Sequence, residues 1–423
     1  MSERKMIYLC LAHMSESGME QKYVQEAFDT NWVVPMGPNV NGFEKDLAEF
    51  VNSKQLDRKV VCLSAGTAAV HLALIACGVK AGDEVLVQSL TFCASSHPIT
   101  YLGAKPVFVD SERETWNMDP ELLEKAIIER KEVTGRYPKA IIPVALYGMP
   151  YDCERIMAIA DKYGIPVIED AAEGMGSRFN GQVLGTFGRF GVLSFNGNKM
   201  ITTSGGGALI CRSAEDANEV MWYATQARDA YPYYEHTAIG YNYRMSNVCA
   251  GIGRGQMTVL DDHIAHHKHV QQLYRELLAD VPGVTLHDQP ADGRYDSNFW
   301  LCAATLDPSV RIVGQENAYK TVITSAVGGA AGVIKAVDSA VTDCQPNDNV
   351  EALRVFMLEK KVECRPVWKP MHKQPVYADA VAYVNGVSED IFKVGFCLPA
   401  GPYVTDEDVR YIVDCIKEAI VSE

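Results

Sequence analysis

Three groups of residues, far apart in the sequence, together have the chemistry to handle an amine. Lys199 follows the polar turn at residues 194–198 and precedes three glycines, which suits a lysine that forms a Schiff base. Asp170 follows a short apolar stretch, so we expect it at the carboxyl end of a buried strand, where open α/β sheets bind ligands. Residues 64–69 follow another such stretch and open a helix, whose free N–H groups and the Thr67 hydroxyl can hold a phosphate. Lysine, acid and phosphate cup together predict pyridoxal phosphate as the cofactor.

The elements that must position these residues follow an alternating pattern. From about residue 60 to 255, short runs rich in Val, Ile and Leu alternate with segments of helical period, which predicts a mostly parallel sheet with crossover helices. The predicted strands cover residues 60–63, 84–87, 105–109, 140–146 and 166–168. A helix is expected at 120–128, with Asp119 as its cap and Gly135 as its stop.

The second part of the chain predicts a smaller α+β unit. A long helix from Ser246 to about Ala279, ended by Pro282, is expected to link the two parts. Further strands are expected at 298–302 and 363–365, and further helices at 349–360 and 406–420. An N-terminal helix at 21–28 is expected to pack on this unit. The predicted domains are therefore residues 1–255, the large α/β domain, and 256–423, the linking helix with the small domain.

Charge and composition exclude several classes of partner and location. The net charge of −15 argues against a nucleic-acid or anionic-membrane partner, which would need a basic surface. The apolar run at 7–12 is shorter than the signal-peptide core of roughly 7–15 residues, and the weakly polar stretch at 322–341 is interrupted by glycines and charges. The twelve cysteines include no C-x-x-C pair, and Cys62, Cys77, Cys211 and Cys302 lie in apolar runs. These features predict a soluble protein with buried thiols in a reducing cytoplasm.

Further motifs occur in order along nearly the whole chain. They are Asn31 to Pro38, Ser64 to Ala69, Thr91-Phe92, Glu169 to Glu173, Ser194 to Gly207, Gly240 to Asn247, Arg365 to His372 and Cys397 to Pro399. This set resembles the DegT/DnrJ/EryC1/StrS family of nucleotide-sugar aminotransferases. The resemblance implies the aspartate-aminotransferase-like fold of fold type I enzymes, with a mostly parallel seven-stranded sheet and a smaller α+β domain. Residues 315–349 depart from the family pattern as an insertion.

The resemblance also implies roles for the three residues nearest the reaction. Lys199 would carry pyridoxal phosphate and then move the proton as general acid and base. Asp170 would keep the pyridine nitrogen protonated, because the ring accepts electrons as a pyridinium. Glu173 stands where relatives carry Gln or Glu facing the cofactor, although it also suits the first turn of a helix.

The remaining cofactor residues are implied in the same way. Gly66, Thr67 and Ser194 would hold the phosphate. Phe92 would either cover one face of the ring or belong to the core. Asn242 would reach the phosphate from the neighbouring subunit, so the resemblance implies a homodimer with shared active sites.

Three motifs indicate the substrate. Relatives that act on UDP-4-keto-6-deoxy-N-acetylglucosamine share the segments at 13–15, 196–198 and 253–257. Residues expected to line the sugar-nucleotide pocket, or else to be structural, are His13, Met14, Arg228, Asn298 and His372. The predicted reaction converts UDP-2-acetamido-2,6-dideoxy-hexos-4-ulose to the 4-amino sugar with glutamate as donor, for surface polysaccharide or glycan synthesis. The alternatives are a GDP- or dTDP-linked keto sugar, or a regulatory protein without turnover.

A metal site is not predicted. His263 and His267 share one helix face within a histidine-rich stretch. No third ligand is identifiable, and Lys268 beside them would repel a cation, so a solvated polar face is the preferred interpretation.

Overall fold

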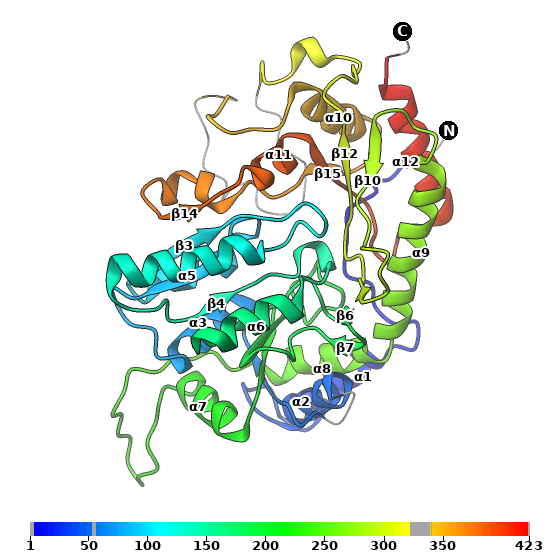
Figure 1. The fold of residues 1–423 in the computed structure, drawn as a ribbon. Helices are drawn as coiled ribbons and strands as arrows, with labels where there is room; N and C mark the ends of the chain where they lie inside the picture. Colours follow the sequence, from blue (N-terminus) through cyan, green and yellow to red (C-terminus); the bar gives the residue numbers. More distant parts are fainter. Residues whose placement is uncertain (1–3, 53–55, 322–338, 340, 422–423) are drawn as a thin grey trace.

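The centre of the protein is a mixed sheet with helices on its faces (Figure 1). We describe it from a computed structural model, for residues 4–52, 56–321, 339 and 341–421. One half of the sheet has the strand order β1 (Lys59–Leu63), β9 (Gly207–Cys211), β8 (Phe190–Ser194), β5 (Ile168–Asp170). The other half has the strand order β14 (Ala382–Tyr383), β3 (Lys105–Val109), β2 (Glu84–Gln88), β4 (Ile141–Ile142). Parallel bridges from Ile141 to Val167 and from Val144 to Asp170 join the halves.

The expected seven-stranded, mostly parallel sheet is confirmed. Its seven strands are β1 to β5, β8 and β9, of which β9 alone runs antiparallel to its neighbours β1 and β8. The strand β14 adds an eighth member from the C-terminal part of the chain. Val85, Leu86 and Val87 are fully buried, as expected for a strand covered on both faces. The strand expected at 140–146 is shorter, because Pro143 has no N–H to continue the ladder.

Helices cover both faces of this sheet. They are α3 (Gly66–Ala76), α4 (His97–Tyr101), α5 (Pro120–Thr134), α6 (Cys153–Tyr163) and α7 (Ala214–Ala224). The expected ends of α5 are confirmed: the Asp119 carboxylate accepts from the N–H groups of Glu121 and Leu122, and Gly135 is left-handed with φ 74°. The expected burial of Cys62, Cys77, Cys211 and Cys302 is also confirmed.

The prediction of one long helix from Ser246 to Ala279 is wrong. The structure has α8 (Asn247–Met257) and α9 (Leu260–Leu278), which run in different directions (Figure 1). At the break, the Thr258 hydroxyl donates to the Gly255 carbonyl at 2.6 Å and the Val259 N–H donates to the Gln256 carbonyl at 3.1 Å. These bonds close the last turn of α8 and let the chain change direction. The proposed domain division after residue 255 falls near this break.

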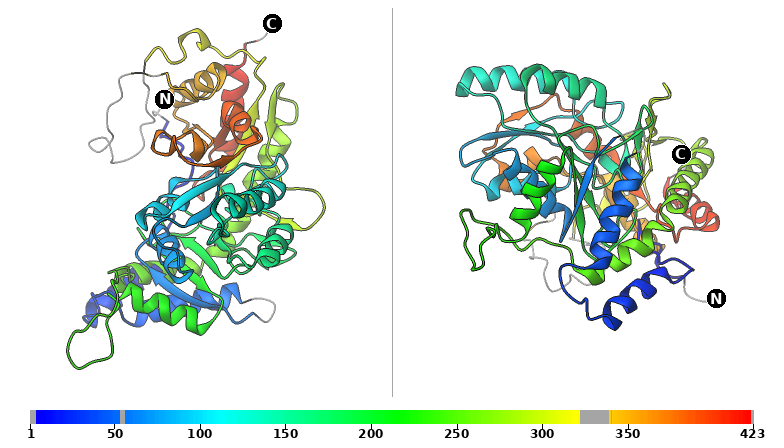
Figure 2. Two further views of the ribbon diagram at one scale, coloured as in Figure 1. Left: turned by 60° about the vertical axis from the view of Figure 1, so that its left-hand side comes forward. Right: turned by 90° about the horizontal axis from the view of Figure 1, so that it is seen from below.

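The N-terminal helix packs against helix α8 and not, as expected, on the second unit. Helix α1 (Met19–Asp29) packs against α8, and α2 (Pro38–Val51) packs beside them (Figure 2). The contact is close because α8 carries glycines: a Cβ at Gly255 would lie 2.5 Å from the Glu20 nitrogen. A side chain at this position would therefore prevent the observed approach of α1.

A second, antiparallel sheet occupies the C-terminal part. Its order is β10 (Val284–Leu286), β12 (Cys302–Leu306), β15 (Gly395–Leu398), β13 (Arg365–Pro366), and it packs with α9, α10 (Asp348–Glu359), α11 (Val387–Val394) and α12 (Asp406–Ala419). The expected α+β composition and the two C-terminal helices are confirmed. The strand expected at 298–302 begins only at Cys302, because Phe299 has a left-handed backbone, with φ 49°.

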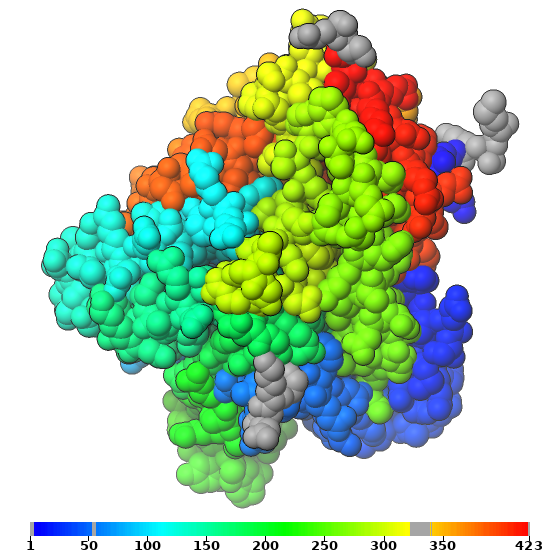
Figure 3. All heavy atoms as spheres, turned by 45° about the vertical axis from the view of Figure 1, so that its right-hand side comes forward, coloured from blue at the N-terminus to red at the C-terminus, as the bar shows by residue number. Residues whose placement is uncertain are grey.

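The two ends of the chain meet at this second sheet. Ile7 forms a parallel bridge with Val362, and Arg4 pairs with Asp408 of α12 at 3.1 Å. In Figure 3 the blue residues of the N-terminal part lie beside the red residues of the C-terminal part. A small third sheet has the order β11 (Tyr295–Asp296), β6 (Arg178–Phe179), β7 (Gln182–Val183). Most of the predicted insertion, at 322–338 and 340, lies outside the described residues. In the described part of the chain, every helix is too short or too polar to cross a bilayer.

Candidate active site

A cavity of about 320 Å³ lies at the carboxyl end of β5, beside the start of α3. It brings together residues that are more than 100 positions apart in the sequence. The predicted cofactor residues that line it are Gly66, Thr67, Phe92, Asp170, Glu173, Ser194 and Lys199. All the predicted cofactor residues except Asn242 therefore meet in one place.

The predicted phosphate cup lies where β1 and β8 meet the first turn of α3. Helix α3 begins at Gly66 without a capping side chain, so its first N–H groups keep their capacity to bind an anion. A Cβ at Gly66 would lie 3.2 Å from the Ser194 Cβ, and a Cβ at Gly207 would lie 2.4 Å from the Gly66 nitrogen. The glycines thus let helix and strands approach closely, with the Thr67 and Ser194 hydroxyls at the same spot.

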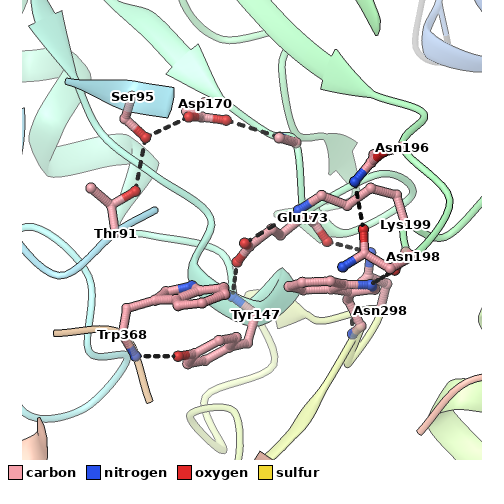
Figure 4. A network of polar contacts seen from close by, with 12 residues as sticks. Thr91, Ser95, Tyr147, Asp170, Glu173, Asn196, Asn198, Lys199, Asn298 and Trp368 are labelled. Atoms are coloured by element: carbon pink, nitrogen blue, oxygen red, sulfur yellow. Dashed lines mark hydrogen bonds and ion pairs between the residues drawn. The ribbon is translucent and has the colours of Figure 1, made fainter. Parts of the chain in front are cut away.

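The Asp170 carboxylate is held by two donors at the end of β5. The Ser95 hydroxyl donates to Oδ2 at 2.6 Å and the Ala172 N–H donates to Oδ1 at 3.1 Å (Figure 4). Thr91 extends this chain, with its hydroxyl 2.8 Å from that of Ser95. Asp170 is 6% exposed. Its oxygens keep lone pairs for a further donor, which is what a protonated ring nitrogen requires.

Lys199 reaches into the cavity toward a second carboxylate. Its Nζ lies 3.3 Å from Oε1 of Glu173 and 4.0 Å from the ring centre of Trp300 (Figure 4). The other Glu173 oxygen accepts from the N–H of Tyr147 at 2.7 Å, and Tyr147 is itself left-handed, with φ 53°. Burial raises the pKa of the Glu173 carboxyl, while the Lys199 ammonium opposes that rise. With 13% of its side chain exposed, Lys199 is no ordinary surface lysine.

These groups fit the polar parts of pyridoxal phosphate. The amine of Lys199 matches the aldehyde, the Asp170 carboxylate matches the ring nitrogen, and the cup at Gly66 matches the phosphate. Phe92 is 49% exposed and packs against Trp368 with ring centres 5.4 Å apart. It therefore stands at the mouth of the cavity, and the alternative of a core residue is wrong for Phe92.

Two predicted residues lie on a segment that leaves the body of the protein below α7 (Figures 1 and 2). Asn242 forms a backbone bridge with Thr225, and the Arg228 guanidinium lies 4.3 Å from the ring centre of Tyr234. Neither lines the cavity. The role of Asn242 in a neighbouring subunit and the sugar contact of Arg228 stay predictions.

The other predicted sugar contacts also lie outside the cavity lining. His13 stacks on Tyr403 with ring centres 4.3 Å apart, and the neighbouring Met14 is partly exposed. His372 lies 2.6 Å from the Ser89 hydroxyl and 3.3 Å from Glu389. Their contacts with a sugar nucleotide stay predictions.

Asn298 has a place behind the cavity. Its side-chain NH₂ donates to the carbonyls of Glu173 and Met175, both at 2.9 Å, and the side chain is fully buried. In this structure Asn298 supports the backbone of Glu173, which fits the structural alternative considered for it. A direct sugar contact is not observed and stays a prediction.

Several residues of the site were not identified from the sequence. They are Ser95, Tyr147, Trp300 and Trp368, whereas Asn196 and Asn198 belong to the expected substrate motif at 196–198 and do line the cavity. Ser95 follows Thr91 by four residues, the spacing of one helical turn, and that was the available signal. Tyr147 and Trp300 occur in apolar runs, where a core position is the ordinary expectation, and Trp368 lies within the motif Arg365 to His372 without having been assigned a role.

Comparisons with known proteins agree with this geometry. The chain matches the DegT/DnrJ/EryC1/StrS aminotransferase family over residues 15–318 and 315–417. It is 41% identical to the protein EpsN of Bacillus subtilis (strain 168), over 97% of this chain and 95% of that protein. It is 33% identical to GDP-perosamine synthase of Escherichia coli O157:H7, over 98% of this chain and 99% of that protein.

A solved structure shows the same fold. The DegT DnrJ EryC1 StrS aminotransferase of Brucella abortus superposes with a TM-score of 0.79 at 25% identity, over 95% of both chains. Because 95% of both chains superpose, the similarity includes the central sheet and the C-terminal sheet. The chain therefore belongs to the DegT/DnrJ/EryC1/StrS aminotransferase family and is a pyridoxal phosphate-dependent sugar aminotransferase.

Proposed function

We propose that this enzyme transfers the amino group of glutamate to the keto carbon of a nucleotide-linked 4-keto-6-deoxy sugar, for a surface polysaccharide or glycan. The observation that carries the proposal is one cavity in which Lys199, Asp170 and the cup at Gly66 come together. The family membership supplies the sugar class, and the 4-keto position rests on the motifs at 13–15, 196–198 and 253–257.

The chain's own residues divide the work of proton handling. Pyridoxal phosphate, when bound, supplies a carbonyl carbon that joins the amine and a ring that accepts electrons. Lys199 Nζ acts as a base only when neutral, and Glu173 Oε1 at 3.3 Å is placed to take its proton. Asp170, fixed by Ser95 and Ala172, holds a proton at the ring nitrogen. Two carboxylates in one cavity thus have separate roles because their partners differ.

Two nucleotide classes are candidates, and separate observations favour each. The UDP-linked 2-acetamido sugar is favoured by the motif at 196–198, since Asn196 and Asn198 line the cavity with neutral amides that can pair with an acetamido group. A 37% identity to UDP-2-acetamido-2-deoxy-3-oxo-D-glucuronate aminotransferase of Pseudomonas aeruginosa also supports it, over 58% of this chain. The GDP-linked sugar is favoured by the GDP-perosamine synthases at 33% and 32% identity.

A panel of substrates tests both the function and the nucleotide. The purified enzyme, loaded with pyridoxal phosphate, is incubated with glutamate and the UDP-linked 2-acetamido-4-keto-6-deoxy sugar, or with GDP- or dTDP-linked 4-keto-6-deoxyhexoses. Initial rates of 2-oxoglutarate release give kcat/KM, and NMR of the product gives the amine configuration. If the pocket forms hydrogen bonds with the acetamido group, a sugar without that group leaves buried polar partners unpaired. Each unpaired group should cost about 1–3 kcal/mol of transition-state binding free energy.

The outcomes of the panel separate the proposals. Equal or higher kcat/KM for the GDP-linked sugar would replace the UDP assignment. Turnover of none of the three would contradict amination of a 4-keto sugar. A bound cofactor without any turnover would favour the regulatory alternative.

We also propose that two copies of the chain assemble into a homodimer in the cytoplasm. The segment that carries Arg228 and Asn242 exposes large apolar side chains, with Tyr234 77% and Ile239 85% exposed. Exposed apolar groups in one region are typical of an interface. A partner that covers this segment would bring its Asn242 to the cup of the other chain, as the resemblance implies.

A further inference from the structure

Two hydrogen bonds hold the backbone on either side of Lys199. On one side, the indole Nε1 of Trp300 donates to the carbonyl of Asn198 at 2.7 Å. On the other side, Nδ1 of His263 lies 3.1 Å from the carbonyl of Met200. The N–H of Lys199 bonds within its own turn, to the carbonyl of Asn196 at 3.0 Å. The flanking bonds therefore tie this turn to other parts of the molecule.

Both ties lead to helix α9. His263 is on α9, and His267, one turn later on the same face, has its Nδ1 3.2 Å from the carbonyl of Phe299, next to Trp300. A carbonyl only accepts, so each histidine donates through a protonated Nδ1. Burial lowers the pKa of both histidines, which favours the neutral ring with a single N–H. Both side chains are buried, so the expected solvated polar face is wrong for His263 and His267, and the pair instead holds two backbone segments.

We propose that His263 and Trp300 are positioning residues that fix the backbone of Lys199 and so set where its Nζ reaches. The proposal rests on the proposed function only in taking Lys199 as the reactive amine. A lysine side chain has four rotatable bonds, and a fixed backbone limits the positions that its amine samples. A displacement of about 1 Å from the productive geometry can cost roughly 10²-fold in rate. Helix α9 thereby couples the C-terminal sheet to the reactive amine.

The first test compares three substitutions on α9. His263→Leu removes the donor to Met200, and His263→Asn returns an N–H donor at nearly the same place. His266→Leu is the matched control, because His266 bonds the Gly401 carbonyl at 3.2 Å from the same helix, away from the lysine turn. We expect His263→Leu to lower kcat about 10- to 100-fold with little change in either KM. His263→Asn should recover part of the loss, and His266→Leu should keep the wild-type kcat.

The second test measures the amine without turnover. Apoenzyme is mixed with pyridoxal phosphate, and stopped-flow absorbance follows formation of the lysine-bound chromophore. The dependence of the rate on cofactor concentration separates loose binding from covalent capture. We expect His263→Leu and Trp300→Phe to lower the rate of covalent bond formation between the lysine and the cofactor at least roughly fivefold, because a misplaced amine attacks less often. The dissociation constant of the initial noncovalent complex should not change. Trp300→Phe keeps an aromatic ring at this position but removes the N–H donor together with part of the buried ring volume.

The two tests give distinct results for each claim. Covalent capture of the cofactor by the wild-type protein needs no sugar, so it should still be observed if the sugar assignment is wrong. The absence of any capture would refute Lys199 as the reactive amine. Wild-type capture rate and kcat in both His263→Leu and Trp300→Phe, with only a lower Tm, would mean a structural role and overturn the proposal. An equal loss in His266→Leu would overturn it as well. If His263→Leu does not fold, His263→Asn and Trp300→Phe decide the matter by the same measurements.

Discussion

At the scale of single residues, two carboxylates share the cavity in different surroundings. Asp170 accepts from a hydroxyl and a backbone N–H, whereas Glu173 faces the Lys199 ammonium and the Tyr147 N–H. Lys199 and Asp170 could be predicted because each follows a recognisable strand or turn. Ser95 could not, because its partner lies 75 positions away and only the fold joins them.

The first prediction concerns Asp170→Asn. The substitution keeps an oxygen for the Ala172 N–H and removes the charge that holds the ring nitrogen protonated. We expect kcat to fall by about three orders of magnitude, because loss of the electron sink raises the barrier by several times 1.4 kcal/mol. Ser95→Ala, which removes one hydrogen bond to the same carboxylate, should cost roughly tenfold.

Steady-state rates, circular dichroism and cofactor absorbance check this prediction together. The spectra establish that the fold and the cofactor are retained. Near wild-type activity of Asp170→Asn with a fully bound cofactor would refute the assigned role.

The second prediction concerns the acid sensitivity of His267. Burial lowers the pKa of this histidine from 6.5 to about 3. Below pH 6.5 the unfolded chain therefore binds a proton that the folded chain does not, and the free energy of unfolding falls with acidification by up to about 1.4 kcal/mol per pH unit. His267→Asn keeps an N–H donor for Phe299 and removes this contribution.

Urea unfolding of both proteins at pH 5, 6 and 7 measures the effect. The stability advantage of wild type over His267→Asn should shrink by about 2 kcal/mol between pH 7 and pH 5. Parallel pH profiles for the two proteins would argue against a neutral, buried His267.

At the scale of elements, local signals were sufficient wherever the sequence itself marks the ends. Helix α5 has Asp119 and Gly135 at its ends, and the strands β1, β2 and β3 are apolar runs. The break between α8 and α9 falls at Thr258 and Val259, which are not helix-breaking residues. The sequence therefore does not mark this break, and tertiary packing determines where α8 ends. The same holds for residues 298–301, where the bonds of Asn298 override an apolar, strand-like sequence.

The third prediction concerns the glycines of α8. A Cβ at Gly253 would lie 2.6 Å from the ring of Phe43 and 2.8 Å from the Thr203 methyl group. Because both neighbours are buried, Gly253→Ala should lower the free energy of unfolding by about 1–3 kcal/mol, although alanine is the better helix former.

Gly42→Ala in α2 is the matched control for this helix contact. Its Cβ would meet the Arg254 guanidinium at 2.5 Å, the far end of a flexible side chain that can move away. Chemical denaturation of both variants measures the difference. Equal stabilities would show that α8 has room for a methyl group.

At the scale of the whole molecule, the assembly decides whether the active site is complete. The cup at Gly66 has donors from its own chain, while Asn242 lies on a segment outside the cavity lining. In a twofold dimer the same surface of each chain meets the other, so both sites would gain one Asn242. The sequence suggested this arrangement only through its resemblance to a family, since no local pattern reports a contact between chains.

The fourth prediction tests shared sites by mixing two inactive proteins. Lys199→Ala lacks the amine and Asn242→Leu lacks the proposed phosphate contact. After subunit exchange in an equal mixture, random pairing gives one intact site in each mixed dimer, which is roughly a quarter of all sites. We expect activity to return toward that level, measured by 2-oxoglutarate release. Exchange confirmed by mass spectrometry without any recovery would rule out sharing.

The pairing of β14 with β3 sets a condition on synthesis at the ribosome. The C-terminal segment reaches back to the central sheet, and Asn385 donates to Asp110 across 275 positions. Until that segment emerges, one border of the sheet presents unpaired N–H and C=O groups. At roughly 5–20 residues per second, this exposure lasts on the order of tens of seconds. A nascent chain of this enzyme therefore carries an incomplete sheet with an aggregation-prone edge for most of its translation. Chaperone protection is of greatest value during that period.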